Sequence, residues 1–119
     1  MNPEIEKLLK VLDLSEKKQH EWLINNSLIE SKYGRFPWSV VLADLAFRLR
    51  DEVINEDVKS SIDCWWCEAS YEVYLYVIGE ENEKDEIGLD TWFSMRAKPI
   101  HWIIAALIAK ELSKGKSND

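Results

Sequence analysis

The stretch YEVYLYVI, residues 71–78, decides the fold class that the sequence predicts. Its side chains alternate between two sets with a period of two, which is typical of a strand, and every residue except Glu72 favours extended structure. Gly79 follows directly and ends the segment. We therefore predict a β-strand over 71–78.

Two flanking stretches have a similar pattern, and they predict partners for this strand. Residues 62–69 precede it, and residues 89–97 follow it with Thr91, Phe93 and Met95 on one face. Hairpins would join the three strands into an antiparallel sheet.

Helical patterns surround the predicted sheet. Pro3, after an N-cap asparagine, is typical of a helix start, and Ser15 begins a second helix, so an N-terminal helix pair is expected. Apolar residues at helical spacing predict a helix over 40–54. Pro99 begins a last helix, which Gly115 is expected to end.

The order of these elements predicts an α+β fold, in which a short antiparallel three-stranded sheet packs between helices. We expect a helical segment over 1–30 that packs on the same domain. Residues 31–115 would form an α-β-β-β-α sandwich, and 116–119 a disordered tail.

The chain has 119 residues, of which 46% are hydrophobic, and 22 acidic against 15 basic side chains give it a formal net charge of −7. That charge repels a phosphate backbone, so nucleic-acid binding is not expected. Part of it is concentrated in one run of five acids: Glu80, Glu81, Glu83, Asp85 and Glu86. The run is either a solvated loop or an acidic patch that docks on a basic partner or mimics nucleic-acid phosphates, and it lacks the spacing of a calcium loop.

Targeting and membrane signals are weak. The N-terminal residues are charged, which does not fit a secretory signal. The longest apolar stretch, residues 99–109, is far shorter than the roughly 20 residues that cross a bilayer. We therefore expect a cytoplasmic protein with reduced cysteines and no membrane partner.

Cys64 and Cys67 form a C-x-x-C motif around two tryptophans. On a strand, residues three apart point to opposite faces, which prevents a disulfide and joint metal binding; a turn at this point would restore both. The interpretations are ordinary buried cysteines, a metal site or a redox site. A zinc site usually needs four ligands, and His20 and His101 are the only histidines.

His101 completes the set of weak metal candidates, together with Cys64 and Cys67. Its place in the first turn of the last helix favours a simpler interpretation, a histidine that forms a local hydrogen bond. No metal and no cofactor is therefore expected.

Six tryptophans are an unusual number for this length. Trp65 and Trp66 are adjacent, so on a strand they would face opposite sides of the sheet. If the second face is open to solvent, Trp66 with Tyr74 and Tyr76 makes an aromatic patch suited to a protein partner. If helices cover both faces, these residues belong to the core.

The C-terminal half carries a family resemblance. An amphipathic helix near a Trp-Ser pair, aromatic-rich strands and the segment AKPIHWIIAALIA, residues 97–109, resemble small phage and prophage proteins with an α-β-α (ABA) sandwich domain. The resemblance covers about residues 36–113. It implies a sheet between helices and a phage or prophage origin, and it transfers no activity because the family is of unknown function.

No set of residues in the sequence converges on a catalytic arrangement. The leading interpretation is a small non-enzymatic phage-type accessory protein that acts as a protein-interaction module. Its protein partner is unknown, and a homodimer is one expected form. The alternatives are an acidic inhibitor or decoy of a nucleic-acid-binding host protein, and a Cys-x-x-Cys metal or redox protein.

Overall fold

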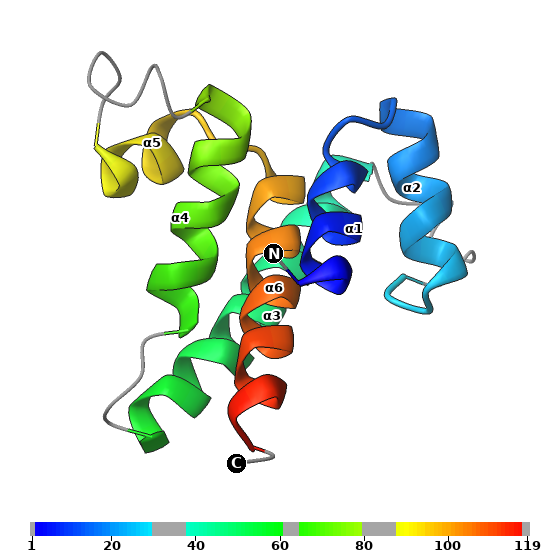
Figure 1. Ribbon diagram of the computed structural model, residues 1–119. Coiled ribbons are helices and arrows are strands. Elements are labelled where there is room, and N and C mark those ends of the chain that lie inside the picture. Colours follow the sequence, from blue (N-terminus) through cyan, green and yellow to red (C-terminus); the bar gives the residue numbers. More distant parts are fainter. Residues whose placement is uncertain (1, 30–37, 61–64, 80–87, 118–119) are drawn as a thin grey trace.

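The computed structural model of the protein describes residues 2–29, 38–60, 65–79 and 88–117. Within these ranges it contains six helices and no strand (Figure 1). The helices are α1 (Pro3–Val11), α2 (Glu16–Asn25), α3 (Trp38–Ser60), α4 (Trp65–Ile78), α5 (Leu89–Met95) and α6 (Pro99–Ser117). The protein is all-helical in its described part, so the predicted α+β fold with a three-stranded sheet is wrong.

The stretch at residues 71–78, predicted as a strand, is the second half of α4. Over all 14 residues of the helix, the buried positions recur every three or four residues: Trp65, Ala69, Ser70, Val73 and Tyr74. The eight residues 71–78 alone fit a strand pattern. The helical pattern becomes visible only when all 14 residues of α4 are considered together. Strand preference is weak, and burial against neighbouring helices overrides it.

The other two predicted strands are corrected as well. Most of residues 89–97 form the short helix α5, which buries Trp92 and Phe93. The last part of 62–69 belongs to the first turns of α4, and residues 62–64 lie outside the described ranges.

The predicted helix starts are confirmed at the N-terminal pair. Asn2 caps α1, because its Oδ1 accepts a hydrogen bond from the Glu4 N–H at 2.9 Å. Ser15 caps α2 by accepting from the Lys18 N–H at 3.4 Å. Each cap satisfies one of the N–H groups that have no partner within the helix.

The two long helices are also confirmed, and both exceed their predicted lengths. Helix α3 contains the whole predicted segment 40–54. Helix α6 begins at Pro99 as expected and continues past Gly115 to Ser117. The first two residues of the predicted tail are therefore helical, and 118–119 lie outside the described ranges.

Helix α6 runs through the middle of the molecule, and α1, α3 and α4 pack around it (Figure 1). Six of its residues are at most 1% exposed: Ile103, Ile104, Ala105, Ala106, Ile108 and Ala109. A helix that is apolar on nearly every side must be covered on nearly every side. Its three alanines present small side chains, which lets neighbouring helices approach closely.

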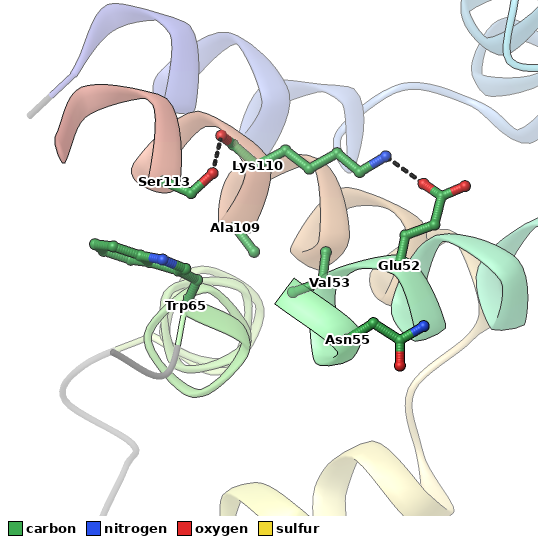
Figure 2. Close-up of a pocket in the computed structure, with 7 residues that line it drawn as sticks. All are labelled: Glu52, Val53, Asn55, Trp65, Ala109, Lys110 and Ser113. Atoms are coloured by element: carbon green, nitrogen blue, oxygen red, sulfur yellow. Dashed lines mark hydrogen bonds and ion pairs between the residues drawn. The ribbon is translucent and has the colours of Figure 1, made fainter. Parts of the chain in front are cut away.

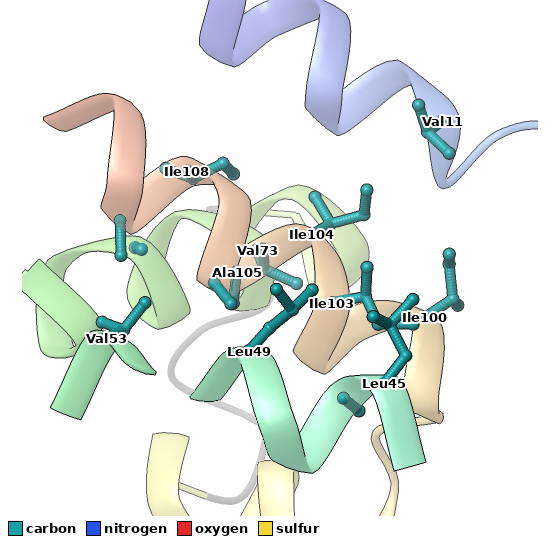
Figure 3. Close-up of a cluster of buried hydrophobic side chains, with 14 of the residues drawn as sticks. Val11, Leu45, Leu49, Val53, Val73, Ile100, Ile103, Ile104, Ala105 and Ile108 are labelled. Carbon is teal, nitrogen blue, oxygen red and sulfur yellow. The ribbon is translucent and has the colours of Figure 1, made fainter. Parts of the chain in front are cut away.

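The core forms where the other helices turn their apolar faces toward α6 (Figure 3). Leu45, Leu49 and Val53 follow one another at every fourth position of α3, which places them on one face. Val73 of α4 and Val11 of α1 belong to the same buried cluster. The N-terminal helices are thus part of this core.

Along the described stretches of the chain, no helix combines the length and the apolar composition needed to span a bilayer.

Candidate functional site

An apolar groove lies between α3, the α5 region and the start of α6. Its volume is about 250 Å³, and its lining is formed by Ala43, Ala46, Phe47, Phe93, Ser94, Ala97, Pro99 and Trp102. Ser94 is the only polar residue among these. Its hydroxyl donates a hydrogen bond to the Asp90 carbonyl at 2.8 Å, within its own helix. The groove is therefore an apolar surface open to solvent.

One large exposed apolar side chain lines this groove, and two others lie close to its lining residues in the sequence. Phe47 is 61% exposed and Met95, which follows the lining residue Ser94, is 76% exposed. Val40 is 55% exposed and lies three residues before Ala43 on α3. Exposed apolar side chains beside an apolar groove often mark an interaction site. We call these three residues, with the groove lining, the groove surface.

Arg50 adds a charge beside the groove. Together with Ala43, Ala46 and Phe47 it occupies positions i, i+3, i+4 and i+7 of α3, which form one helical face. Its Cζ lies 5.4 Å from the centroid of the Trp102 ring. Its Nε is buried, and no hydrogen-bond partner for it exists in the described part of the protein. Because the Nε is shielded from solvent, a carboxylate from outside could pair only with the terminal nitrogens of this guanidinium.

An aromatic cluster supports the floor of the groove. Trp102 stacks on Trp66, with ring centroids 5.5 Å apart and planes 20° apart. Phe93 meets Trp102 edge to face at 5.1 Å and contacts Trp66 at 6.1 Å. Rings fixed on several sides keep the groove in one shape.

The predicted aromatic patch does not form as one surface. Tyr74 is 2% exposed and packs edge-on against Trp92, with ring centroids 5.7 Å apart, while Trp66 is half-buried. Tyr76 is exposed, and its hydroxyl donates to the Asp13 carboxylate. On a helix, positions 74 and 76 differ by about 200°, so they cannot share a face.

The contact with Asp13 also changes the chemistry of Tyr76. The hydrogen bond to the carboxylate, together with partial burial and the nearby negative charge, raises the pKa of the Tyr76 hydroxyl. The phenol is therefore kept neutral. It connects α4 to the turn between α1 and α2.

A second, more polar cleft of about 420 Å³ lies where α3, α4 and α6 meet (Figure 2). Its lining comprises Glu52, Val53, Asn55, Trp65, Ala109, Lys110 and Ser113. Lys110 Nζ and Glu52 Oε2 are 2.5 Å apart, and the Ser113 hydroxyl donates to the Lys110 carbonyl at 3.0 Å. The two charged side chains of the cleft thus bind each other.

The C-x-x-C motif lies at the start of α4. Cys67 is the third residue of that helix, is exposed to solvent and is disulfide-bonded. The expectation of reduced cysteines is therefore corrected. The argument against a disulfide assumed a strand, and Cys67 lies in a helix instead. Cys64 lies outside the described ranges.

His101 forms the local hydrogen bond that its position predicts. It is the third residue of α6, and its Nδ1 accepts from the Lys98 N–H at 2.8 Å. Burial, with a smaller effect of the Lys98 charge, lowers the pKa of His101 to about 4. The ring is therefore a neutral helix cap at physiological pH.

Metal-binding groups do not gather in the part of the chain that is described. No cluster of three or more His, Cys, Asp or Glu side chains there could hold an ion. The acidic run at 80–86 lies outside the described ranges, and so its predicted role as an acidic patch stays a prediction.

No protein-family model, curated protein or solved structure matches this chain. The phage or prophage origin implied by the resemblance to ABA sandwich domains stays a prediction. The sheet that the same resemblance implies is contradicted by the helices α4 and α5.

Sequence reasoning missed the groove surface. A signal was present in Phe47, which falls between Leu45 and Leu49 on the predicted helix but off its apolar face. A large aromatic residue on the polar side of an amphipathic helix needs either a neighbouring element or a partner to cover it.

Proposed function

We propose that the protein is a non-enzymatic interaction module whose groove surface binds an amphipathic helix of a partner protein. The partner helix inserts a large apolar side chain between α3 and α6 and places one carboxylate against Arg50. The observation that carries this proposal is the combination of an apolar groove, the exposed Phe47 ring in its lining and the Arg50 guanidinium over the lining residue Trp102.

The size of the groove favours side chains over a cofactor. Small-molecule pockets usually span roughly 300–1,000 Å³ and enclose most of the ligand. This groove, at about 250 Å³, is smaller and open along one side. A helix that lies across an open groove needs room only for its anchoring side chains.

The border residues suit a partner surface. Phe47 offers a broad apolar ring, and Met95 offers a flexible, polarisable side chain that adapts to different shapes. Both are exposed in the free protein. Covering them would remove apolar area from water, which is the main favourable contribution to most protein associations.

Charge defines the partner further. The whole chain carries −7, so a strongly acidic partner would be repelled at long range. Arg50 requires one acid next to the apolar anchor, where it can pair with the guanidinium. The expected partner helix is therefore neutral or basic overall, with a single Glu or Asp beside a Leu, Met or Phe.

In the test, a display library of short amphipathic helical peptides is selected for binding to the natural protein. The affinity of each selected peptide is then compared with that of a version in which Glu is replaced by Gln. Phe47→Asp is expected to weaken binding of the selected peptides by at least about tenfold, because it places a charge at the border of an apolar site. Arg50→Met is expected to remove the preference for Glu over Gln. Fluorescence anisotropy of labelled peptides measures both.

The matched control is Val77→Asp on α4, where the original side chain is 43% exposed and lies off the groove surface. It should bind the peptides as the natural protein does. Failure to select any helix, or an equal loss for Phe47→Asp and Val77→Asp, contradicts the proposal. A homodimer that Phe47→Asp dissociates would assign the groove to a second copy and would also contradict it.

A further inference from the structure

We infer that a further cleft, formed by α1, α6 and the α2 region, binds a free α-amino acid with an aliphatic or aromatic side chain. Its volume is about 360 Å³. Pockets for small molecules usually measure roughly 300–1,000 Å³, so this cleft is large enough for such a ligand. None of its described lining residues also lines the groove, and the inference is therefore independent of the proposed function.

Part of the lining is apolar and suits the side chain of such a ligand. Four partly buried side chains pack against the core and also line the cleft: Leu8, Trp22, Leu28 and Leu107. Their contacts with the core hold them in place, while their accessible parts face the cleft. An aliphatic or aromatic group that covers these parts leaves water, which favours binding.

Trp22 provides an aromatic surface that is not engaged by another ring. Trp66 and Trp102 stack on each other, and Trp38 stacks on His20 with ring centroids 4.2 Å apart. Trp22, by contrast, contacts no second ring within the ranges that the structure describes. Its half-buried indole can therefore pack against the side chain of a ligand without displacing an existing partner.

Two ion pairs supply charges that match the head group of an amino acid. Lys7 Nζ lies 3.3 Å from Glu4 Oε1 on α1, and Lys114 Nζ lies 3.2 Å from Glu111 Oε1 on α6. All four residues line the cleft. Each pair places an ammonium beside a carboxylate, and an α-amino acid carries the same two charges side by side. The ligand carboxylate can therefore bind a lysine while its ammonium binds the glutamate of the same pair.

This mixed charge selects against ligands that carry a single charge. A carboxylate without an ammonium is repelled by Glu4 and Glu111, and an amine without a carboxylate is repelled by the lysines. Lys110 also lines the cleft, but its ammonium is paired with Glu52, so the balance is unchanged. The two pairs on α1 and α6 involve mostly exposed lysines and contribute little to stability, so they can turn toward a ligand at small cost.

Asn26 adds a polar atom to the lining. Its Nδ2 donates a hydrogen bond to the Trp22 carbonyl at 2.8 Å, which fixes the orientation of the side-chain amide. No group in the described part of the protein donates to its Oδ1. A ligand ammonium has three N–H donors, so it can bind this oxygen and a glutamate together.

The test compares three probes that share a phenyl ring and differ in their head groups: phenylalanine, 3-phenylpropanoate and 2-phenylethylamine. Each probe is titrated into the full chain, and NMR follows the indole N–H of Trp22, assigned with Trp22→Phe. We expect saturable shifts with phenylalanine and an affinity at least about tenfold weaker for each of the other probes. Equal affinities for the three probes, shifts that do not saturate, or an unchanged Trp22 signal would overturn the inference.

Two double variants complete the test. Lys7→Gln with Lys114→Gln should weaken phenylalanine binding at least about fivefold, because the ligand carboxylate loses its charged partners. Lys10→Gln with Lys17→Gln is the matched control, since it removes the same charge from exposed positions that do not line the cleft. Far-UV circular dichroism should be the same for both variants and the natural protein. An equal loss of binding in the two variants, or none in the first, would also overturn the inference.

Discussion

The middle of α6 and the outward side of α3 carry side chains of the same apolar kind in opposite surroundings. Ile103, Ile104 and Ile108 of α6 are fully buried between neighbouring helices. Phe47 of α3 and Met95 at the end of α5 are mostly exposed. Burial stabilises the folded state only where side chains leave water, so the first set supports the fold and the second contributes little to it.

The difference follows from how many helices cover each region (Figure 1). Helix α6 has α1, α3 and α4 packed around it. On the outward side of α3, the described residues that line the groove come from α3, from the α5 region and from the first turn of α6. A surface whose apolar residues do not stabilise the fold can change or bind a partner without unfolding the protein.

The largest expected effect comes from breaking the buried region. Ile104→Ala should lower the free energy of unfolding by about 3–4 kcal/mol, because it removes buried methyl groups and leaves a cavity inside α6's packing. Urea unfolding followed by circular dichroism measures it. Val77→Ala, at an exposed position of α4, is the control and should change it by less than about 0.5 kcal/mol. A similar loss of unfolding free energy for both variants would contradict the distinction between the buried α6 and the exposed surface.

The same contrast explains what the sequence could predict. Helix α6 was predictable because its apolar residues keep the helical period from Ile100 to Leu112 after a proline start. Helix α4 was not, because residues 71–78 satisfy the strand pattern and the deciding residues, such as Ala69, lie upstream. Small residues such as alanine and serine contribute little to a hydrophobic pattern in the sequence. When they are buried, however, they determine which face of a helix packs against its neighbours.

The candidate sites were harder to predict than the helices. The groove joins α3, α5 and α6, so its existence depends on packing between distant segments, although Phe47 was a visible anomaly. The C-x-x-C motif was visible, but its interpretation depended on whether Cys67 lies in a helix or a strand. The wrong prediction of a strand at this motif therefore led to the wrong prediction that Cys67 forms no disulfide.

The next largest expected effect is a pH dependence of stability caused by His101, which lies at the start of α6 beside the aromatic cluster. The drop in its pKa from 6.5 to about 4 means that the unfolded chain binds a proton more readily than the folded one. Stability should therefore be complete above pH 6.5 and fall as the pH decreases toward 4. The full shift corresponds to about 3 kcal/mol, and partial exposure of the ring reduces the expected loss to about 1–2 kcal/mol.

His101→Gln isolates this contribution, because glutamine can still accept the hydrogen bond from the Lys98 N–H and does not titrate. The difference in unfolding free energy between the natural protein and the variant should change between pH 7 and pH 4.5. Subtraction removes the acidic groups common to both. A constant difference would show that the ring is open to protons in the folded state.

A smaller effect is expected for the ion pair of Lys110, and measuring its strength tests where the buried part of α6 ends. Lys110 follows Ala109, and its ammonium pairs with Glu52 at 2.5 Å while both side chains remain partly exposed (Figure 2). A double-mutant cycle with Lys110→Gln and Glu52→Gln should give a coupling energy of about 0.2–1 kcal/mol, reduced by high salt. A coupling above about 2 kcal/mol would place this pair inside the buried region.

The smallest expected effect is at Phe47. Phe47→Ala should change the free energy of unfolding by less than about 0.5 kcal/mol, because a ring that is 61% exposed loses little contact with water on folding. Leu49→Ala, two residues along the same helix at a position 5% exposed, is the matched control and should cost about 2–4 kcal/mol. Urea titrations of both variants measure the two values side by side. A loss above about 1 kcal/mol for Phe47→Ala would make the groove part of the core, and the distinction between a supporting helix and a binding surface would then fail.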